Sequence, residues 1–240
     1  MSRLNRRQVL LASAPLALTL SGFPGTRGFA DPAPARFGEP HPLDFGVLQQ
    51  TAKSLAARSY APTKAPAPVV VDKIDFDAAQ HIKFRANRQL FGDGPGPFPV
   101  RLFHVDKFNS LPVQINVLSG GTARRVIYSP EDFDYGDTGL AQKLPPDTGF
   151  SGFRVMDSHQ AATDWLAFQG ASYFRSSGQD NQYGGSARGI AVNTVSSSKE
   201  EFPRFVEFWL AEPQAGRASM TIYALLDRPS LTGAYPFEPT

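Results

Sequence analysis

The feature that most constrains this fold is a pattern of side chains that alternates with a period of two. Four runs show it, at residues 113–117, 190–193, 205–210 and 221–226. Such a period places one set of side chains on each face of a β-strand, whereas a surface helix repeats every 3.6 residues. The 21 glycines, 21 prolines and 19 phenylalanines favour many strands joined by turns. We therefore expect a mainly β protein built as one large antiparallel β-sandwich.

Strict alternation makes specific predictions for the last two runs. It places Phe205, Glu207 and Trp209 on one face of the first strand. In the second run, Tyr223 lies on an alternating face and Asp227 stands at the strand end. The sequence AEPQAGRAS between these runs suits a hairpin loop.

A short helix is expected before the strands, in DFGVLQQTAKSLAARSY. Asp44 is a suitable N-cap, and Phe45, Leu48, Ala52 and Leu55 fall close to one helix face. The proline-rich sequence APTKAPAPVV then ends any helix.

The first 30 residues have the pattern of an export signal, with Arg6-Arg7, an apolar stretch from Val9 to Leu20, and small residues before Asp31. The arginine pair resembles a twin-arginine signal, which would make the twin-arginine translocon a partner; an ordinary secretory signal is the alternative. The segment holds four of the 24 basic residues and no acid, so the remainder has 20 basic and 22 acidic groups. A net charge of −2 gives no electrostatic reason to expect nucleic acid binding.

Common catalytic and cofactor patterns are not matched. The four histidines lack metal-ligand spacing, and no cysteine is present. In EDFDYGDTG, counting from Asp132, an EF-hand needs glycine at position six and glutamate at position twelve, but Asp137 and Lys143 stand there, which favours a solvated turn. Neither Ser172 nor Ser186 lies in a G-x-S-x-G elbow. Prolines interrupt the glycines of FGDGPGPF, so it is a turn rather than a phosphate loop. We therefore expect no metal and no cofactor.

Saccharide binding is the chemistry that the remaining residues suit, because sugars pack on aromatic faces and their hydroxyls bond planar polar groups. Core packing of Trp209 and Tyr223, with Glu207 at an edge, is the alternative for the two strands. For the loop in 170–194, expected as strand, glycine-rich loop and strand, the alternative is a structural role with arginines paired to acids such as Glu200 or Asp227. The candidate ligand contacts are Tyr173, Arg175, Tyr183, Arg188, Glu207, Trp209, Tyr223 and Asp227.

Six sequence strings together resemble the periplasmic glucan biosynthesis proteins of the MdoG and MdoD type, also written OpgG and OpgD. They are FDYG, DTGFSGFR, GASYFR, YGGSARGIAVNT, EEFPRFVEFWL and IYALLDRPSLTGAY, in the order and spacing of the family. The twin-arginine start is similar to the MdoD branch.

This resemblance implies a periplasmic protein with a large sandwich of the galactose mutarotase type, followed by a smaller immunoglobulin-like domain. It implies a role in making osmoregulated periplasmic glucans, with β-1,2-glucan as ligand and cleavage by a glycoside hydrolase mechanism. A non-catalytic, scaffolding partner of the membrane glucan synthase is the alternative.

Family members are about twice as long, so residues 31–240 are expected to be the N-terminal part of the sandwich, with the immunoglobulin-like domain absent. The family's catalytic aspartates fall beyond TGAY, and no catalytic residue is assigned here. Pro236 also departs from the usual arginine. Because half a sandwich leaves strand edges unpaired, we expect residues 1–240 alone to be poorly stable.

Overall fold

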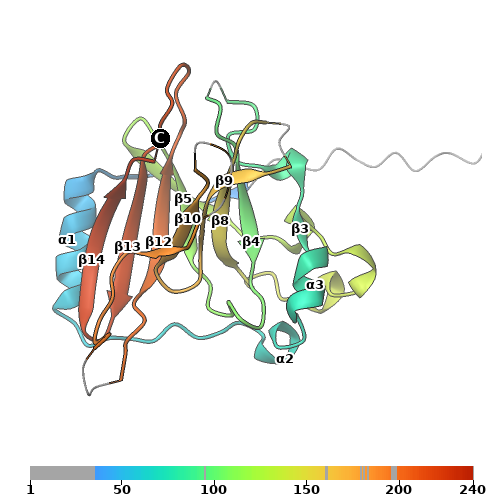
Figure 1. Ribbon diagram of the computed structural model, residues 1–240, viewed down its shortest axis with the longest axis horizontal. Coiled ribbons are helices and arrows are strands. Elements are labelled where there is room, and N and C mark those ends of the chain that lie inside the picture. The colour runs from blue at the N-terminus through green and yellow to red at the C-terminus, as the bar shows by residue number, and fades with distance from the viewer. Residues whose placement is uncertain are drawn as a thin grey trace, which may run out of the picture. The chain divides into compact units, whose positions relative to one another are not determined.

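The computed structural model describes residues 36–94, 96–159, 162–178, 180, 182, 184–195 and 199–239. The predicted export signal and Tyr183 lie outside these residues. Among the residues described, no helix is both long and apolar enough to cross a membrane. The predicted fold class is confirmed, because two larger, mainly antiparallel sheets dominate the chain (Figure 1).

The first sheet has seven strands in the order β1-β6-β5-β12-β13-β14, with β2 also paired to β6. Every pairing in this sheet is antiparallel except that of β12 with β5, which is parallel. The sequence prediction of an antiparallel sandwich did not include this parallel pair. The predicted hairpin between β12 and β13 is confirmed. The strands are β1 (Arg36–Phe37), β2 (His41–Pro42), β5 (Gln114–Ser119), β6 (Thr122–Ile127), β12 (Arg204–Ala211), β13 (Ile222–Arg228) and β14 (Leu231–Phe237).

The second sheet has five antiparallel strands in the order β11-β10-β9-β8-β4. They are β4 (Val100–His104), β8 (Phe150–Met156), β9 (Asp164–Gln169), β10 (Tyr173–Ser176) and β11 (Ala187–Arg188). A two-stranded ladder joins β3 (Lys83–Phe84) to β7 (Phe133–Asp134).

Phenylalanines from both larger sheets form the core between them. Phe153 and Phe168 stack with ring centroids 5.1 Å apart, and Phe208 of β12 meets Phe168 edge-on at 5.5 Å. All three rings are at most 2% exposed. Aromatic rings bury large areas and gain further from such geometries, which accounts for the use of many phenylalanines in place of disulfides.

The predicted N-terminal helix is confirmed as α1 (Phe45–Ala56). Its N-cap is Asp44, whose Oδ1 accepts a hydrogen bond from the backbone N of Val47 at 2.8 Å. Leu48 and Ala52 are buried, and α1 lies against β13 and β14 on the face turned away from the second sheet (Figure 1). The other helices are short: α2 (Pro68–Val71), α3 (Phe76–His81), and four 3₁₀ turns, η1 (Ala86–Arg88), η2 (Pro130–Asp132), η3 (Gly136–Thr138) and η4 (Ala141–Lys143).

Candidate functional site

The sequence-predicted ligand contacts do not form one cleft. Tyr173, Arg175 and Arg188 lie on β10 and β11 of the five-stranded sheet. The other described candidates lie on β12 and β13 of the seven-stranded sheet; they are Glu207, Trp209, Tyr223 and Asp227. Tyr183 lies outside the described residues.

Arg188 of β11 is held by contacts with β10 and with the segment before β12. An Arg188 nitrogen donates to Oε1 of Glu200 at 2.7 Å, and the guanidinium carbon lies 5.7 Å from the ring centroid of Tyr173 and 5.6 Å from that of Phe202. Of the two acids offered as structural partners, Glu200 is therefore the one that Arg188 contacts. This arrangement favours the structural interpretation of the loop.

The second strand predicted in this loop is shorter than expected. β11 contains only Ala187 and Arg188, so the alternation of Ile190 and Val192 does not mark a strand. Val192 forms an isolated bridge with Glu201 instead. The chain here packs closely on the core, since a Cβ added to Gly189 would lie 2.8 Å from the ring of Phe205.

A β-bulge overturns the predicted face for Phe205. The ladder pairs Phe205 with Leu226 and Glu207 with Leu225, so one extra residue of β12 is accommodated between them. Phe205 consequently faces the core between the sheets, together with Phe208. Glu207 and Trp209 remain on the opposite face, where α1 packs. A bulge depends on the partner strand, and the alternation within β12 gives no sign of it.

Trp209 and Tyr223 pack under α1, and not in the core between the two larger sheets, where the core alternative placed them. Trp209 is 4% exposed and belongs to a cluster with Leu48 and Leu225. The Tyr223 ring centroid lies 5.5 Å from that of Phe45. Burial of Trp209 under the helix favours a packing role for this residue over a role as a platform for sugar.

Glu207 and Asp227 line the same groove, which has a volume of about 620 Å³. They are diagonal neighbours on one face, because Glu207 pairs with Leu225 and Asp227 lies two residues further along β13. Such neighbours are about 7–8 Å apart. The remaining polar lining comes from α1, the segment after it, β5, β6, the segment after β6 and the loop before β8. It consists of Thr51, Thr63, Gln114, Arg125, Tyr128 and Asp147.

Hydrogen bonds fix both carboxyl groups. Nδ2 of Asn116 donates to Oε1 of Glu207 at 2.8 Å, and Oγ1 of Thr232 donates to Oδ1 of Asp227 at 2.8 Å. Burial raises the pKa of Glu207, although the Asn116 hydrogen bond and the charges of Arg125 and His41 act in the opposite direction. The groove thus offers oriented acceptors, and a carboxyl group that keeps its proton to higher pH than usual.

Sequence reasoning missed Asn116, which is 1% exposed. Its alternation with Val117 indicated a solvent-facing polar residue, but β5 lies inside the sheet beside β12. Nδ2 of Asn116 also donates to the backbone O of Phe208 at 3.0 Å, across the parallel pairing. No pattern within the strand indicates this partner.

A second cavity, of about 170 Å³, brings Tyr173 close to Arg204 and Arg228. Arg204 is 4% exposed and donates to the backbone O atoms of Leu111 and Pro112 at 3.1 and 2.8 Å. Burial lowers its pKa to about 10, with the charge of Arg228 acting in the same direction. These bonds to chain carbonyls give Arg204 a structural role at the cavity wall.

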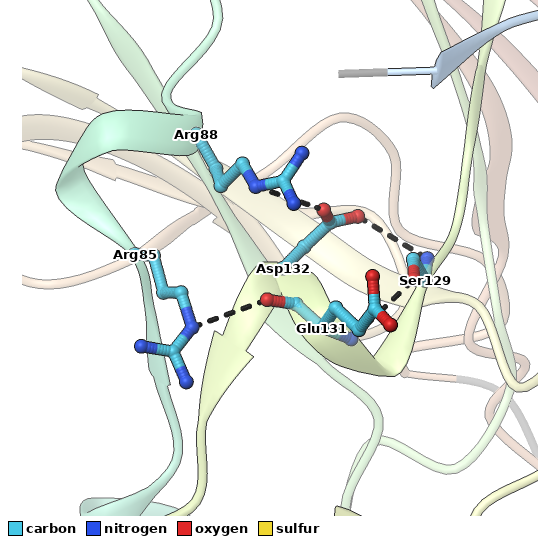
Figure 2. A network of polar contacts seen from close by, with 5 residues as sticks. All are labelled: Arg85, Arg88, Ser129, Glu131 and Asp132. Atoms are coloured by element: carbon cyan, nitrogen blue, oxygen red, sulfur yellow. Dashed lines mark hydrogen bonds and ion pairs between the residues drawn. The ribbon is translucent and has the colours of Figure 1, made fainter. Parts of the chain in front are cut away.

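The acidic segment EDFDYGDTG is only partly the solvated turn expected. Asp132 is 7% exposed; its Oδ1 lies 3.7 Å from Nε of Arg88, and its Oδ2 accepts from the backbone N of Ser129 (Figure 2). Nε of Arg85 donates to the backbone O of Glu131 at 3.1 Å. Burial raises the pKa of Asp132, against the lowering effect of Arg88.

Within the described ranges, no three histidines or acids gather as a metal site would require.

Comparison with known proteins assigns the family. The sequence model described as "Periplasmic glucan biosynthesis protein, MdoG" matches residues 43–240. The chain is 40% identical to "Glucans biosynthesis protein D" of Xanthomonas oryzae pv. oryzae strain PXO99A over 99% of its length, and 41% identical to "Glucans biosynthesis protein D 2" of Ralstonia nicotianae over 96%. In both alignments it spans only 45% of the relative. The chain belongs to the MdoG family of periplasmic glucan biosynthesis proteins.

Proposed function

We propose that this chain supplies a glucan-binding part of a periplasmic glucan biosynthesis protein, with β-1,2-glucan as the ligand. The observation that carries the proposal is the groove on the seven-stranded sheet, where Glu207 and Asp227 stand beside Arg125 and Gln114. Its volume lies in the range of ligand sites. The family relationship supplies the link to glucan.

The polar groups of the groove match the hydroxyl groups of a sugar. Carboxylate oxygens accept from hydroxyls, while Arg125 and Gln114 can donate to them. Asn116 and Thr232 hold the two carboxyl groups in place before ligand arrives, which reduces the entropy lost on binding. We assign Glu207 and Asp227 to binding, and cleavage of glucan to carboxyl groups of the longer relatives.

Calorimetric titration with linear β-1,2-glucan tests the binding site. We expect Asp227→Asn and Glu207→Gln each to weaken binding about tenfold, since a hydrogen bond to a charged group contributes roughly 1.5–3 kcal/mol. The matched control is Glu212→Gln, because Oε2 of Glu212 accepts from Oγ of Ser119 at 2.7 Å and Glu212 does not line this groove. Equal affinities for the three variants and the unaltered chain would overturn the assignment.

A chain-length assay tests where cleavage occurs. The chain and the full-length Xanthomonas oryzae relative are incubated separately with linear β-1,2-glucan, and product length is followed by chromatography. Shortening by the relative alone is the expected result. If neither shortens a glucan that both bind, a scaffolding role beside the membrane glucan synthase replaces cleavage. If both shorten it, Glu207 and Asp227 become catalytic candidates, and the assignment of these residues to binding alone is wrong.

We also propose that residues 1–30 direct export through the twin-arginine translocon, on the basis of Arg6-Arg7 and the apolar stretch that follows. The double variant Arg6→Lys, Arg7→Lys should remain in the cytoplasm when cells are fractionated. Undiminished export of this variant would indicate an ordinary secretory route.

A further inference from the structure

A row of arginines crosses the outer face of the five-stranded sheet. Arg175 of β10 pairs with Ala167 of β9, Ala167 pairs with Arg154 of β8, and Arg154 pairs with Arg101 of β4. Residues paired directly across a sheet point to the same side. Three guanidinium side chains therefore share one face, with a single alanine among them.

The neighbouring row shows which face this is. Phe174, Phe168, Phe153 and Leu102 are paired in the same order, and all four pack in the core between the two larger sheets. Since successive residues of a strand point to opposite faces, the arginine row lies on the side turned away from that core.

Two of these arginines, Arg101 and Arg154, lie directly opposite each other. Like charges directly opposite each other destabilise a sheet. Burial lowers the pKa of Arg101, and the adjacent Arg154 lowers it further. Nε of Arg101 donates to Oε1 of Gln89 at 3.2 Å, which satisfies one donor without neutralising the charge.

The positive charge and the N–H donors of Arg154 are only partly matched by acceptors in the described part of the chain. One terminal nitrogen lies 3.8 Å from Oδ1 of Asp164, which is beyond hydrogen-bond distance, and the guanidinium carbon lies 5.6 Å from the ring centroid of Phe103. Its Nε is buried and has no hydrogen-bond partner in the described part of the chain. A buried donor left without an acceptor costs free energy, so an acceptor is expected at this position.

A cavity of about 230 Å³ adjoins Arg154. Lys83 adds a second positive charge to its wall, and Gln80 and Gln169 add amide groups. The wall also contains Asp106, but Oδ1 of this residue already accepts from the backbone N atoms of Phe108 and Asn109, at 2.7 and 2.8 Å. Hydrogen bonds do not remove the charge of Asp106, so the charged groups of the wall are two cations, Arg154 and Lys83, and one carboxylate.

We propose that this cavity binds a small oxyanion, a phosphate or carboxylate group, through Arg154 and Lys83. The planar guanidinium of Arg154 presents two parallel N–H groups that match the oxygens of such an anion. Arg101 adds a positive charge to the same face. The site is separate from the groove of Glu207 and Asp227, which lies on the other larger sheet.

The test is an NMR titration of the protein with inorganic phosphate at constant ionic strength, following the side-chain N–H signals of arginine. We expect saturable shifts for the unaltered protein, and about tenfold weaker binding in Arg154→Gln, because a charge-assisted bidentate pair is lost. Arg154→Lys keeps the charge but loses the two parallel N–H groups of the guanidinium, and should bind with intermediate affinity. The matched control is Arg217→Gln, which removes an exposed arginine from the hairpin loop and should bind as the unaltered protein does.

Several results would overturn the proposal: shifts that rise linearly without saturation, or equal affinity in Arg154→Gln and Arg217→Gln. If Arg154→Gln does not fold, the exposed Lys83 gives an independent test, since Lys83→Gln should weaken binding about fivefold by loss of one charged contact. Unchanged affinity in that variant also contradicts the proposal. A parallel titration with malonate identifies the source of the anion, because saturation by malonate alone indicates a carboxylate ligand and saturation by phosphate alone a phosphate ligand.

Discussion

The outer faces of the two larger sheets differ in what covers them. On the seven-stranded sheet, α1 lies over Trp209, which is buried, and over Tyr223, which is partly buried. On the five-stranded sheet, the corresponding outward positions hold Arg154, Arg101 and Arg175, and the last of these is exposed. One face is a second, smaller core, and the other carries charge.

The contrast shows what a period of two leaves undetermined. Both sheets alternate in sequence, but alternation says only that a strand has two faces. The outward residue types carry the further information. Outward aromatic residues, as in FVEFWL, indicate a face that another element covers, whereas outward arginines, as in GFRVM, indicate a face open to water or ligand.

Replacing Trp209 by alanine gives the largest expected effect and tests the covered face. Truncating a buried tryptophan typically lowers the free energy of unfolding by about 3–5 kcal/mol. Urea unfolding measures the loss, and Phe108→Ala, at a ring that is 68% exposed, is the control, with a change within about 0.5 kcal/mol. If Trp209→Ala unfolds as the unaltered protein does but binds glucan less tightly, this tryptophan is a ligand platform after all.

Removing the helix cap tests α1 as the cover of that face. Asp44→Ala loses the hydrogen bond to the backbone N of Val47 and should lower the free energy of unfolding by about 1 kcal/mol. Asp44→Asn retains an accepting oxygen and should recover most of this loss. Equal stability of Asp44→Ala and the unaltered protein in urea would show that α1 contributes little to the seven-stranded sheet.

The charged face should respond in the opposite direction. Arg101→Gln removes a like charge opposite Arg154, and we expect the free energy of unfolding to rise by roughly 0.2–1 kcal/mol at low salt. The gain should shrink in 1 M NaCl, where the screening length is about 3 Å. A loss of stability at every salt concentration would show that the bond from Arg101 to Gln89 outweighs the repulsion.

Local sequence patterns predicted the elements whose causes are local. The helix 45–56 followed from Asp44 and the spacing of Leu48 and Ala52, and the hairpin of β12 and β13 followed from alternation and turn residues. Features that depend on a distant partner were not predictable. The bulge that turns Phe205 inward depends on β13, and the burial of Asn116 depends on its parallel neighbour β12.

The candidate site divided along the same line. Glu207 and Asp227 lie on one face because β12 and β13 form a hairpin, and a hairpin is a local connection. Arg188, in contrast, contacts Glu200 and Phe202, and no periodicity in the sequence predicts these contacts. Tyr173 and Trp209 lie on different sheets, and this could be predicted only with knowledge of the sheet order.

Glu207 is a partly buried acid on the covered face, and the pH dependence of stability tests its burial. Burial raises its folded-state pKa, so between the ordinary pKa of 4.5 and the folded value the native protein holds a proton that the unfolded chain has lost. Stability from this group is therefore full at low pH and falls as the pH rises through that window. Glu207→Gln cannot titrate, so the free energy of unfolding of the unaltered protein should fall relative to that of the variant as the pH rises from 4.5. If the free energies of unfolding of the two proteins, measured in urea, change with pH in the same way, the Asn116 hydrogen bond and the charge of Arg125 offset burial completely. The groove then holds an ordinary carboxylate.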